Sequence, residues 1–346
     1  MSPKQRIAKY IKTHGSATSA QLAEHMQVTR QAINNHIRAL LADGSVIKTG
    51  STRSARYHAI TSTQPIDVFS RNFALAGLDE SDVYVQVARI LNLKRLLRAN
   101  VESIAHYAFT EMLNNAIDHS GAERCSVVAR INNGRFEFEI RETGIGIFHS
   151  IAEKFDLDDE QTAMVELTKG KTTTMPEAHS GEGIFFTSKV ADRFVLQSHK
   201  IELEWNRRFD DVFVSTPRFR NGTTVNFDIQ TDSRLKLEAV FANYAPEKYN
   251  FEFQKTQVMV KLLQAEYVSR SEAKRLLLNL HKFREIQIDL KDVSRLGQGF
   301  ADEVFRVFAN GHSGIRIAAI NATPNVAAII RHAGGTIESN QTGGEL

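Results

Sequence analysis

Cysteine is almost absent from this chain of 346 residues. Cys125 is the only one, which excludes an internal disulfide and fits a reducing compartment. Long hydrophobic runs are also missing, because the roughly 18 uninterrupted apolar residues that a membrane-spanning helix needs occur nowhere. The first residues, MSPKQRIAKYIKTHG, are polar and basic, with no apolar stretch behind them. We therefore expect a soluble cytoplasmic protein with no membrane partner, and the length predicts two or three domains.

Acidic residues are scarce in the first 60 positions. That segment holds nine Lys and Arg residues against Glu24 and Asp43, which gives it a net charge of +7. Because the whole chain carries +3, the other 286 residues sum to −4. A basic terminal segment on a nearly neutral body is typical of a nucleic-acid-binding module, although a merely solvated domain can also be basic.

The basic segment has the pattern of three short helices followed by two strands. The first helix has apolar residues at Ile7, Tyr10 and Ile11 and stops at Gly15. The second starts behind Ser19, and the third runs from behind Thr29 to Gly44. The next stretch, SVIKTGSTRSARYHAI, predicts two strands joined by a polar, basic loop. Residues 3–60 therefore resemble the winged helix-turn-helix family.

In that family the third helix enters the major groove of double-stranded DNA and the wing contacts the backbone or the minor groove. The resemblance implies base or phosphate contacts from Arg30, Gln31, Asn34, Asn35 and Arg38 on the helix. It implies further contacts from Arg53 and Arg56 on the wing. A winged helix that docks a protein is the alternative; the outer face of the third helix, rich in amides and arginine, favours DNA.

A polar stripe marks the helical segment FTEMLNNAIDHS, Phe109 to Ser120. Residues four apart share one face of a helix, so Glu111, Asn115 and His119 lie one above the other. Taken alone, such a stripe is most simply a solvated face. The glycine-rich segments further along the chain favour a binding site instead.

Glycine pairs recur downstream of this stripe, on the elements where a nucleotide site needs them. CSVVARINNGRFEFEIRE predicts a hairpin around Asn133-Gly134, and it ends at Glu142 before Gly144 and Gly146. The segment HSGEGIFF places Gly181 and Gly183 at the start of a helix, where free N–H groups favour phosphate. A last strand begins with Gly222 and Thr223.

This constellation resembles the GHKL ATPase superfamily of gyrase, sensor histidine kinases, mismatch-repair ATPases and the ninety-kilodalton heat-shock chaperones. The resemblance implies an α/β sandwich that binds ATP and Mg²⁺. Its roles, carried onto this chain, make Asn115 the magnesium ligand and Glu111 the base acting on the attacking water or hydroxyl. They place Glu142, Gly144, Gly146 and Thr223 around the adenine, and Gly181 and Gly183 at the phosphates.

Two features qualify the expected site. Glu142 stands where the superfamily has aspartate, so the adenine contact is displaced by one methylene or made through water. The segment LTKGKTTTMPEAHSGEG is rich in Gly, Thr and Lys and is expected to form a mobile lid over the nucleotide. Lys169 and Lys171 would reach phosphate from that lid, with a solvated position as the alternative for at least one of them.

The last hundred residues alternate strands and helices, which predicts a small α/β domain. Its stretch DLKDVSRLGQGFADEVF resembles the STAS fold of anti-sigma-factor antagonists. In those proteins a serine on the loop after the central strand is phosphorylated. Here the matching position falls at or beside Gly299, and no hydroxyl residue lies between Leu296 and Asp302. Self-phosphorylation on this loop is therefore disfavoured, and Ser294 is interpreted as a cap or turn residue.

The sequence thus predicts a multidomain α/β protein. Its parts are a winged helix at 1–60, an ATP-binding domain at 61–232, a linker at 233–250 and a STAS-like domain at 251–346. We expect a DNA-binding regulator in which ATP binding is coupled to the outer domains, with a regulatory protein as a further partner and a homodimer as a candidate assembly. The alternative is an anti-sigma-type serine kinase that acts on a partner protein. A sensor histidine kinase is disfavoured, because His106 lies on the nucleotide helix itself.

Overall fold

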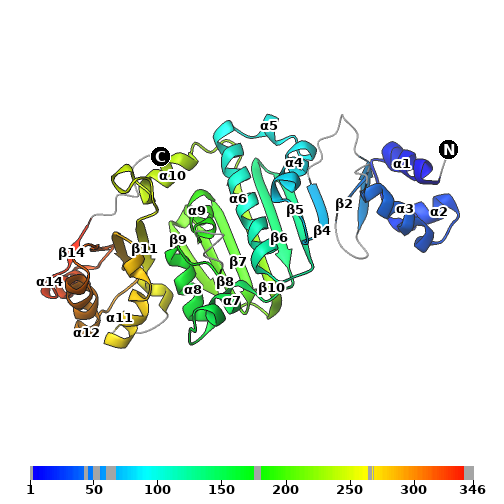
Figure 1. The fold of residues 1–346 in the computed structure, drawn as a ribbon. Helices are drawn as coiled ribbons and strands as arrows, with labels where there is room; N and C mark the ends of the chain where they lie inside the picture. The colour runs from blue at the N-terminus through cyan, green and yellow to red at the C-terminus, as the bar shows by residue number, and fades with distance from the viewer. Residues whose placement is uncertain are drawn as a thin grey trace.

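The computed structural model describes residues 3–42, 46–49, 55–59, 68–174, 181–263, 267 and 269–338. Three sheets divide these residues into an N-terminal, a central and a C-terminal unit (Figure 1). The N-terminal unit has a hydrophobic core of its own, whereas the central and C-terminal units share one continuous core. The chain is therefore a multidomain α/β protein, as predicted.

The N-terminal unit packs three helices on a small antiparallel sheet. The helices are α1 (Pro3–His14), α2 (Ser19–Met26) and α3 (Arg30–Ala42), and the strands, in sheet order, are β1 (Ser16–Ala17), β3 (Arg56–Ala59) and β2 (Val46–Thr49). Ile7 and Ile11 are buried in its core, as their helical spacing predicts. The N-cap of α2 is Thr18, one residue before the predicted Ser19, because Thr18 and Gln21 form a capping box.

The central unit is a seven-stranded sheet in which every neighbouring pair is antiparallel. The strands, in sheet order, are β4 (Val68–Ala74), β5 (Arg124–Asn132), β6 (Arg135–Glu142), β10 (Arg220–Gln230), β7 (Arg193–His199), β8 (Ile201–Asn206) and β9 (Asp211–Ser215). The predicted turn between β5 and β6 is present, with Asn133 and Gly134 both at positive φ. Two left-handed residues give the turn a twist that matches the strands.

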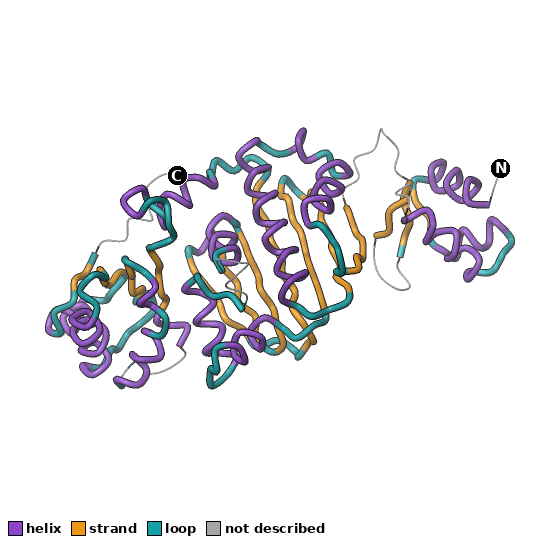
Figure 2. Tube along the Cα trace, in the orientation of Figure 1, coloured by secondary structure: helices purple, strands orange, loops and turns teal. Residues whose placement is uncertain are grey.

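Helices pack on one face of this sheet. They are α4 (Glu80–Ile90), α5 (Leu93–Leu96), α6 (Ala99–His119), α7 (Ile147–Lys154), α8 (Glu160–Lys169) and α9 (Gly183–Val190). The long helix α6 runs across the sheet (Figure 2) and buries Ile104, Ala108, Phe109 and Met112. Alternate residues of β5 and β6 are buried, because one face of the sheet packs against these helices. The helix α6 begins at Ala99, with Arg98 at its N-cap.

The C-terminal unit has a parallel four-stranded sheet. Its strands, in sheet order, are β11 (Lys255–Met259), β12 (Glu285–Asp289), β13 (Arg316–Ile320) and β14 (Thr336–Ile337). Its helices are α11 (Arg270–Leu277), α12 (Gln298–Asp302), a π-helical turn at Glu303–Phe308, α13 (Ala309–Gly311) and α14 (Pro324–His332). The segment 233–250, expected to be a linker, carries α10 (Leu237–Tyr244). Short 3₁₀ turns lie at Arg207–Phe209, Glu247–Tyr249, Val260–Leu263 and Leu280–Lys282.

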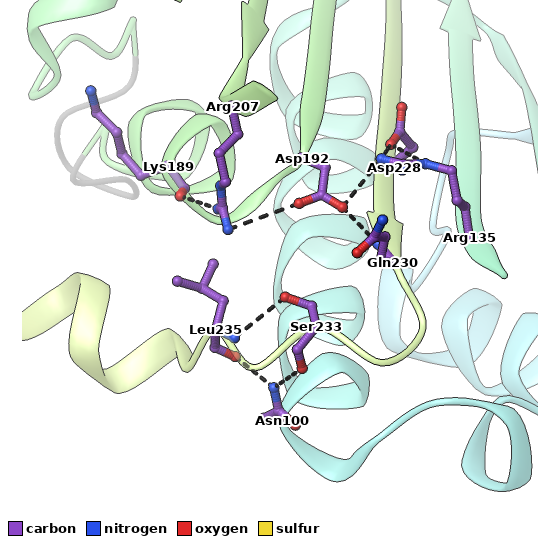
Figure 3. A network of polar contacts seen from close by, with 9 residues as sticks. All are labelled: Asn100, Arg135, Lys189, Asp192, Arg207, Asp228, Gln230, Ser233 and Leu235. Carbon is purple, nitrogen blue, oxygen red and sulfur yellow. Dashed lines mark hydrogen bonds and ion pairs between the residues drawn. The ribbon is translucent and has the colours of Figure 1, made fainter. Parts of the chain in front are cut away.

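An ion-pair network fastens one end of the central sheet (Figure 3). The Arg135 guanidinium pairs with Asp228 on β10 and with Asp192, 3.2 Å away, before β7. The Asp192 carboxylate also accepts a hydrogen bond from the backbone N–H of Gln230 at 2.8 Å. Burial raises the pKa of Asp228, and the Arg135 charge opposes this effect. The network holds the ends of β6, β7 and β10 in one place.

The same figure shows how the chain leaves the sheet. Asn100, in the first turn of α6, donates from Nδ2 to the carbonyl oxygens of Ser233 at 2.8 Å and of Leu235 at 2.6 Å. The backbone N–H of Leu235 donates in turn to the Ser233 hydroxyl. The connection to the C-terminal unit therefore starts from a fixed position on α6.

Replacing Asn100 with alanine removes both hydrogen bonds and leaves two partly buried carbonyls without their donor. We expect the Asn100→Ala change to lower the free energy of unfolding by about 1–3 kcal/mol. Denaturant unfolding measures it. Ser103→Ala, on the exposed side of the same helix, is the control and should change stability by less than about 0.5 kcal/mol. Equal effects of the two variants would contradict the anchoring role of Asn100.

Candidate functional site

A cavity of about 280 Å³ opens in the central unit between α6 and the glycine-rich segments. Its walls come from α6, the end of β6, α7, Leu167 of α8, residues 172–174, residues 181–184, Leu196 of β7 and the start of β10. The predicted site residues that line it are Glu111, Asn115, Glu142, Gly181, Gly183 and Thr223. Six residues spread over more than a hundred positions of the chain thus meet at one cavity.

The polar stripe of α6 faces this cavity. Glu111, Asn115 and His119 all line it, and the buried side chains of Met112 and Ala116 beside them form part of the same wall. Burial and the negative charges of Glu111 and Glu182 raise the pKa of Tyr107, one turn before Glu111. Negative charge is therefore concentrated at the Glu111 end of the cavity, which suits a cation.

The start of α9 lies against Glu111. A Cβ added to Gly183 would overlap the Glu111 carboxylate, so a larger residue here would force that carboxylate to move. Gly183 is the first residue of α9 and comes directly after Glu182 at the N-cap. The first N–H groups of a helix have no intrahelical acceptor, which makes this wall of the cavity suited to an anion.

The opposite end of the cavity is built from the turn after β6. Glu142 is 4% exposed, and its Oε2 accepts a hydrogen bond from the backbone N–H of Gly144. A Cβ on Gly144 would overlap the Ser120 carbonyl, so the turn packs tightly on the end of α6. Gly144 and Gly146 therefore support the wall and do not line the cavity, whereas the resemblance to the GHKL superfamily implied a place for them at the adenine.

Thr223 connects the two sides of that end. Its hydroxyl accepts a hydrogen bond from the backbone N–H of Ile147 at 3.1 Å, and its side chain lines the cavity. Gly146, which precedes Ile147, is the N-cap of α7. The strand β10 is thereby tied to the start of α7 beside Glu142.

Lys169 and Lys171 do not line the cavity, which corrects their expected position. Lys169 is 1% exposed; its ammonium pairs with Glu166 and donates to the carbonyl of Leu278 at 2.9 Å. Burial lowers the pKa of Lys169, and Glu166 opposes the shift. Lys171 donates to the carbonyl of Lys282 at 3.1 Å. Both side chains point to the C-terminal unit because its residues supply their acceptors.

Three consecutive threonines line the cavity in the place expected for these lysines. Thr174 lies within hydrogen-bonding distance of His119, with 2.9 Å between Oγ1 and Nδ1. Thr172 donates to the carbonyl of Glu166 at 3.0 Å. The sequence shows the stretch KTTT, but it does not indicate that the threonines line the cavity and that the lysine does not. The rest of the expected lid, residues 175–180, lies outside the described residues.

Within the residues that the structure describes, no group of three or more His, Cys, Asp and Glu side chains is arranged to hold a metal ion. The described residues also contain no helix with the length and apolar character needed to cross a membrane.

The predicted DNA-contacting residues of α3 share an exposed face. Arg30, Gln31, Asn34, Asn35 and Arg38 are all exposed. The Asn34 Oδ1 accepts a hydrogen bond from the Ser19 hydroxyl at 3.0 Å, which orients its amide. Arg56 is exposed on β3, and its Nε donates to the Ser16 hydroxyl. Arg53 lies outside the described residues.

Comparisons with known proteins identify the two outer domains. Residues 4–62 match the family model of a helix-turn-helix (HTH) domain, and residues 272–327 match that of a STAS-like domain of unknown function. No curated protein sequence matches the chain. A solved IclR-type transcriptional regulator from Alicyclobacillus acidocaldarius is 15% identical, over 80% of this chain and 98% of its own, with a TM-score of 0.15. That score is too low to support a common fold.

Proposed function

We propose that the chain is a DNA-binding transcription regulator whose central unit belongs to the GHKL type and binds magnesium ATP. One observation carries the proposal: Glu111, Asn115 and the glycine-bounded start of α9 face a single cavity. A polar helix face, an anion-binding helix start and a cavity of this size fit a nucleotide better than a solvated surface.

Asn115 would hold Mg²⁺ through its amide oxygen. Hard cations prefer oxygen ligands, and Asn115 lies on the cavity face of α6 one turn from Glu111. When bound, the ion neutralises negative charge on the phosphates. Gly181 and Gly183 line the cavity beside the first N–H groups of α9, where the phosphates would bind.

Glu111 is suited to orient or deprotonate a water or hydroxyl nucleophile. Its carboxylate lies beside Gly183 at the phosphate end, where a nucleophile would approach the terminal phosphorus. His119 lies two helical turns further on, about 12 Å along the axis, and thus toward the base end of the cavity.

The base end is built from Glu142 and Thr223. Glu142 is longer than aspartate, and its Oε2 is already bonded to the N–H of Gly144. An adenine amino group would therefore be met by the other carboxylate oxygen or through a water molecule. Binding of ATP compared with GTP measures how selective this arrangement is.

The helix-turn-helix domain supplies the DNA-binding part of the proposal. The exposed face of α3 presents amides and guanidinium groups, which pair with base edges and phosphates. This domain lies in the basic segment, whose net charge of +7 favours association with DNA.

A serine kinase that acts on a separate protein is the second candidate. It is favoured by Glu111, which would serve a hydroxyl nucleophile as well as water. The loop of this chain's own STAS-like domain has no hydroxyl residue between Leu296 and Asp302, so the acceptor would belong to another protein. Failure to bind duplex DNA would favour this candidate.

Asn115→Ala should abolish magnesium-dependent ATP binding, with affinity falling at least roughly tenfold, while the fold stays intact. Calorimetric titration with ATP, with and without Mg²⁺, measures the effect. Asn132→Ala, an exposed asparagine at the end of β5, is the control. Unchanged magnesium-ATP affinity in the folded Asn115 variant would show that α6 does not hold the ion.

Glu111→Gln should reduce ATP turnover by about 10²- to 10⁴-fold and retain ATP binding, because the base acts on the nucleophile. Glutamine keeps the volume that packs against Gly183. Phosphate release and nucleotide binding are measured on the same preparation, with Glu123→Gln on the exposed surface as the control. Loss of binding together with turnover would assign Glu111 a structural role.

The double change Arg30→Ala and Arg38→Ala should weaken duplex binding and make its salt dependence shallower by roughly two in log–log slope. Changes at Asn34 and Asn35 should alter sequence preference more than salt slope, because amides carry no charge. Binding is measured over a salt series, with and without ATP. Arg234→Ala with Lys236→Ala, both exposed on the segment between the central and C-terminal units, is the charge-matched control. No duplex affinity at low salt in either nucleotide state would overturn the DNA-binding assignment.

A further inference from the structure

One wall of the cavity continues directly into the contact with the STAS-like domain. Residues 169–174 form this stretch, which we call the docked segment. Thr172, Thr173 and Thr174 line the cavity. Lys169 and Lys171, just before them in the chain, bond to the C-terminal unit. The same short stretch therefore touches both.

Hydrogen bonds hold the start of the docked segment. Thr256 on β11 is fully buried and donates from its hydroxyl to the Lys169 carbonyl at 2.6 Å. The Lys169 ammonium donates to the Leu278 carbonyl, and Asn279 donates from Nδ2 to the Glu166 carboxylate at 3.0 Å. A buried hydrogen bond that loses one partner leaves the other unsatisfied, so these contacts resist separation of the two units.

Side-chain packing holds the middle of the docked segment. Gly170 has a φ of +79°, and a Cβ added to it would lie 2.6 Å from Cε1 of Phe253. Lys171 is next, also in the left-handed region, with its ammonium 4.9 Å from the centre of the Phe283 ring. The chain can make this turn on the STAS-like domain only because residue 170 has no side chain.

Thr172 of the docked segment lies at the phosphate side of the cavity. A Cβ on Gly181 would lie 2.7 Å from backbone atoms of Thr172, so these two stretches of backbone are in close contact. The Thr172 hydroxyl is held by the Glu166 carbonyl, on the helix that carries the buried Glu166–Lys169 pair. Residues 169–172 therefore connect Thr256 and Phe253 to Gly181 through direct contacts. A displacement of Thr256 or Phe253 would change the position of Gly181.

A second contact prevents the STAS-like domain from pivoting about the docked segment. Lys261 pairs with Asp211 on β9 and with Asp292, 3.2 Å away. Lys291 donates to the carbonyl of Asp210 at 2.6 Å. These contacts lie at the β8–β9 turn of the central sheet. Two separate attachments fix the orientation of the domain.

We propose that Thr256 and Phe253 of the STAS-like domain are positioning residues for the nucleotide cavity, and that nucleotide affinity depends on how this domain is docked. The proposal rests on the nucleotide-binding function proposed above. Coupling between two sites is reciprocal, so bound nucleotide also strengthens the docking of the STAS-like domain. A protein that binds the STAS-like domain and shifts it would thereby change nucleotide affinity.

Two variants of the full chain test the proposal. Thr256→Val keeps the shape of the side chain and removes the donor to Lys169, and it should lower magnesium-ATP affinity about three- to tenfold. Gly170→Ala introduces the overlap with Phe253 and should lower magnesium-ATP affinity at least as much as Thr256→Val does. Gly334→Ala is the matched control: its φ is +83°, but an added Cβ there meets nothing within 4 Å. It should bind magnesium ATP as the unmodified chain does.

Hydrogen exchange distinguishes a specific loss of coupling between the two units from a general loss of stability. In the unmodified chain, added magnesium ATP should slow amide exchange in residues 253–258 and 278–283 as well as at the cavity. In Thr256→Val that difference should shrink at these distant residues and persist at the cavity. Unchanged affinity in both variants, or nucleotide protection confined to the cavity in the unmodified chain, would overturn the inference alone. Absence of magnesium-ATP binding by the unmodified chain would overturn the proposed function and this inference with it.

Discussion

The two-sided character of α6 is the constraint on which the central unit depends. One side of this helix fills the core with Val101, Ile104, Ala108 and Met112, and the other presents polar groups to the cavity. Burial of the apolar side, at about 25 cal/mol per Å², fixes the rotation of the helix about its axis. That rotation aims Glu111 and Asn115 together, so the geometry of the site is set largely by the packing of Val101, Ile104 and Ala108, which do not line the cavity.

Local patterns in the sequence predicted the elements whose signals are short-range. Helical spacing located α1, α3 and α6, and Asn133-Gly134 located the β5–β6 hairpin, because each signal lies within a few residues of the element that it specifies. The common direction of Glu111 and Asn115 could be predicted from the same spacing. The predicted start of the second helix was wrong by only one residue. Thr18 and Ser19 are adjacent and both are common N-cap residues, and the capping box with Gln21 selects Thr18.

Contacts between distant segments were beyond the reach of those patterns. Lys169 looked like a phosphate ligand because it lies in a Gly-, Thr- and Lys-rich stretch, yet its ammonium pairs with Glu166 and donates to the carbonyl of Leu278, more than a hundred residues away. The direction taken by Glu142 depends on Gly144 and Ser120 meeting at the end of α6. A carbonyl or a close backbone approach leaves no residue-type signature, so only the folded chain reveals these partners.

The buried Glu166–Lys169 pair, both of whose residues lie on α8, is a costly arrangement at the junction of two domains. Removing two charges from water costs several kcal/mol per ion, and well-packed apolar side chains would stabilise the same junction at least as well. An apolar junction, however, tolerates small displacements of one domain relative to the other. This ion pair needs Asn279 and the Leu278 carbonyl in fixed positions, because both are hydrogen-bonded to it. The junction therefore favours one docking geometry over maximal stability. Because Thr172 and its neighbours line the cavity a few residues further on, that geometry is also the geometry of the cavity wall.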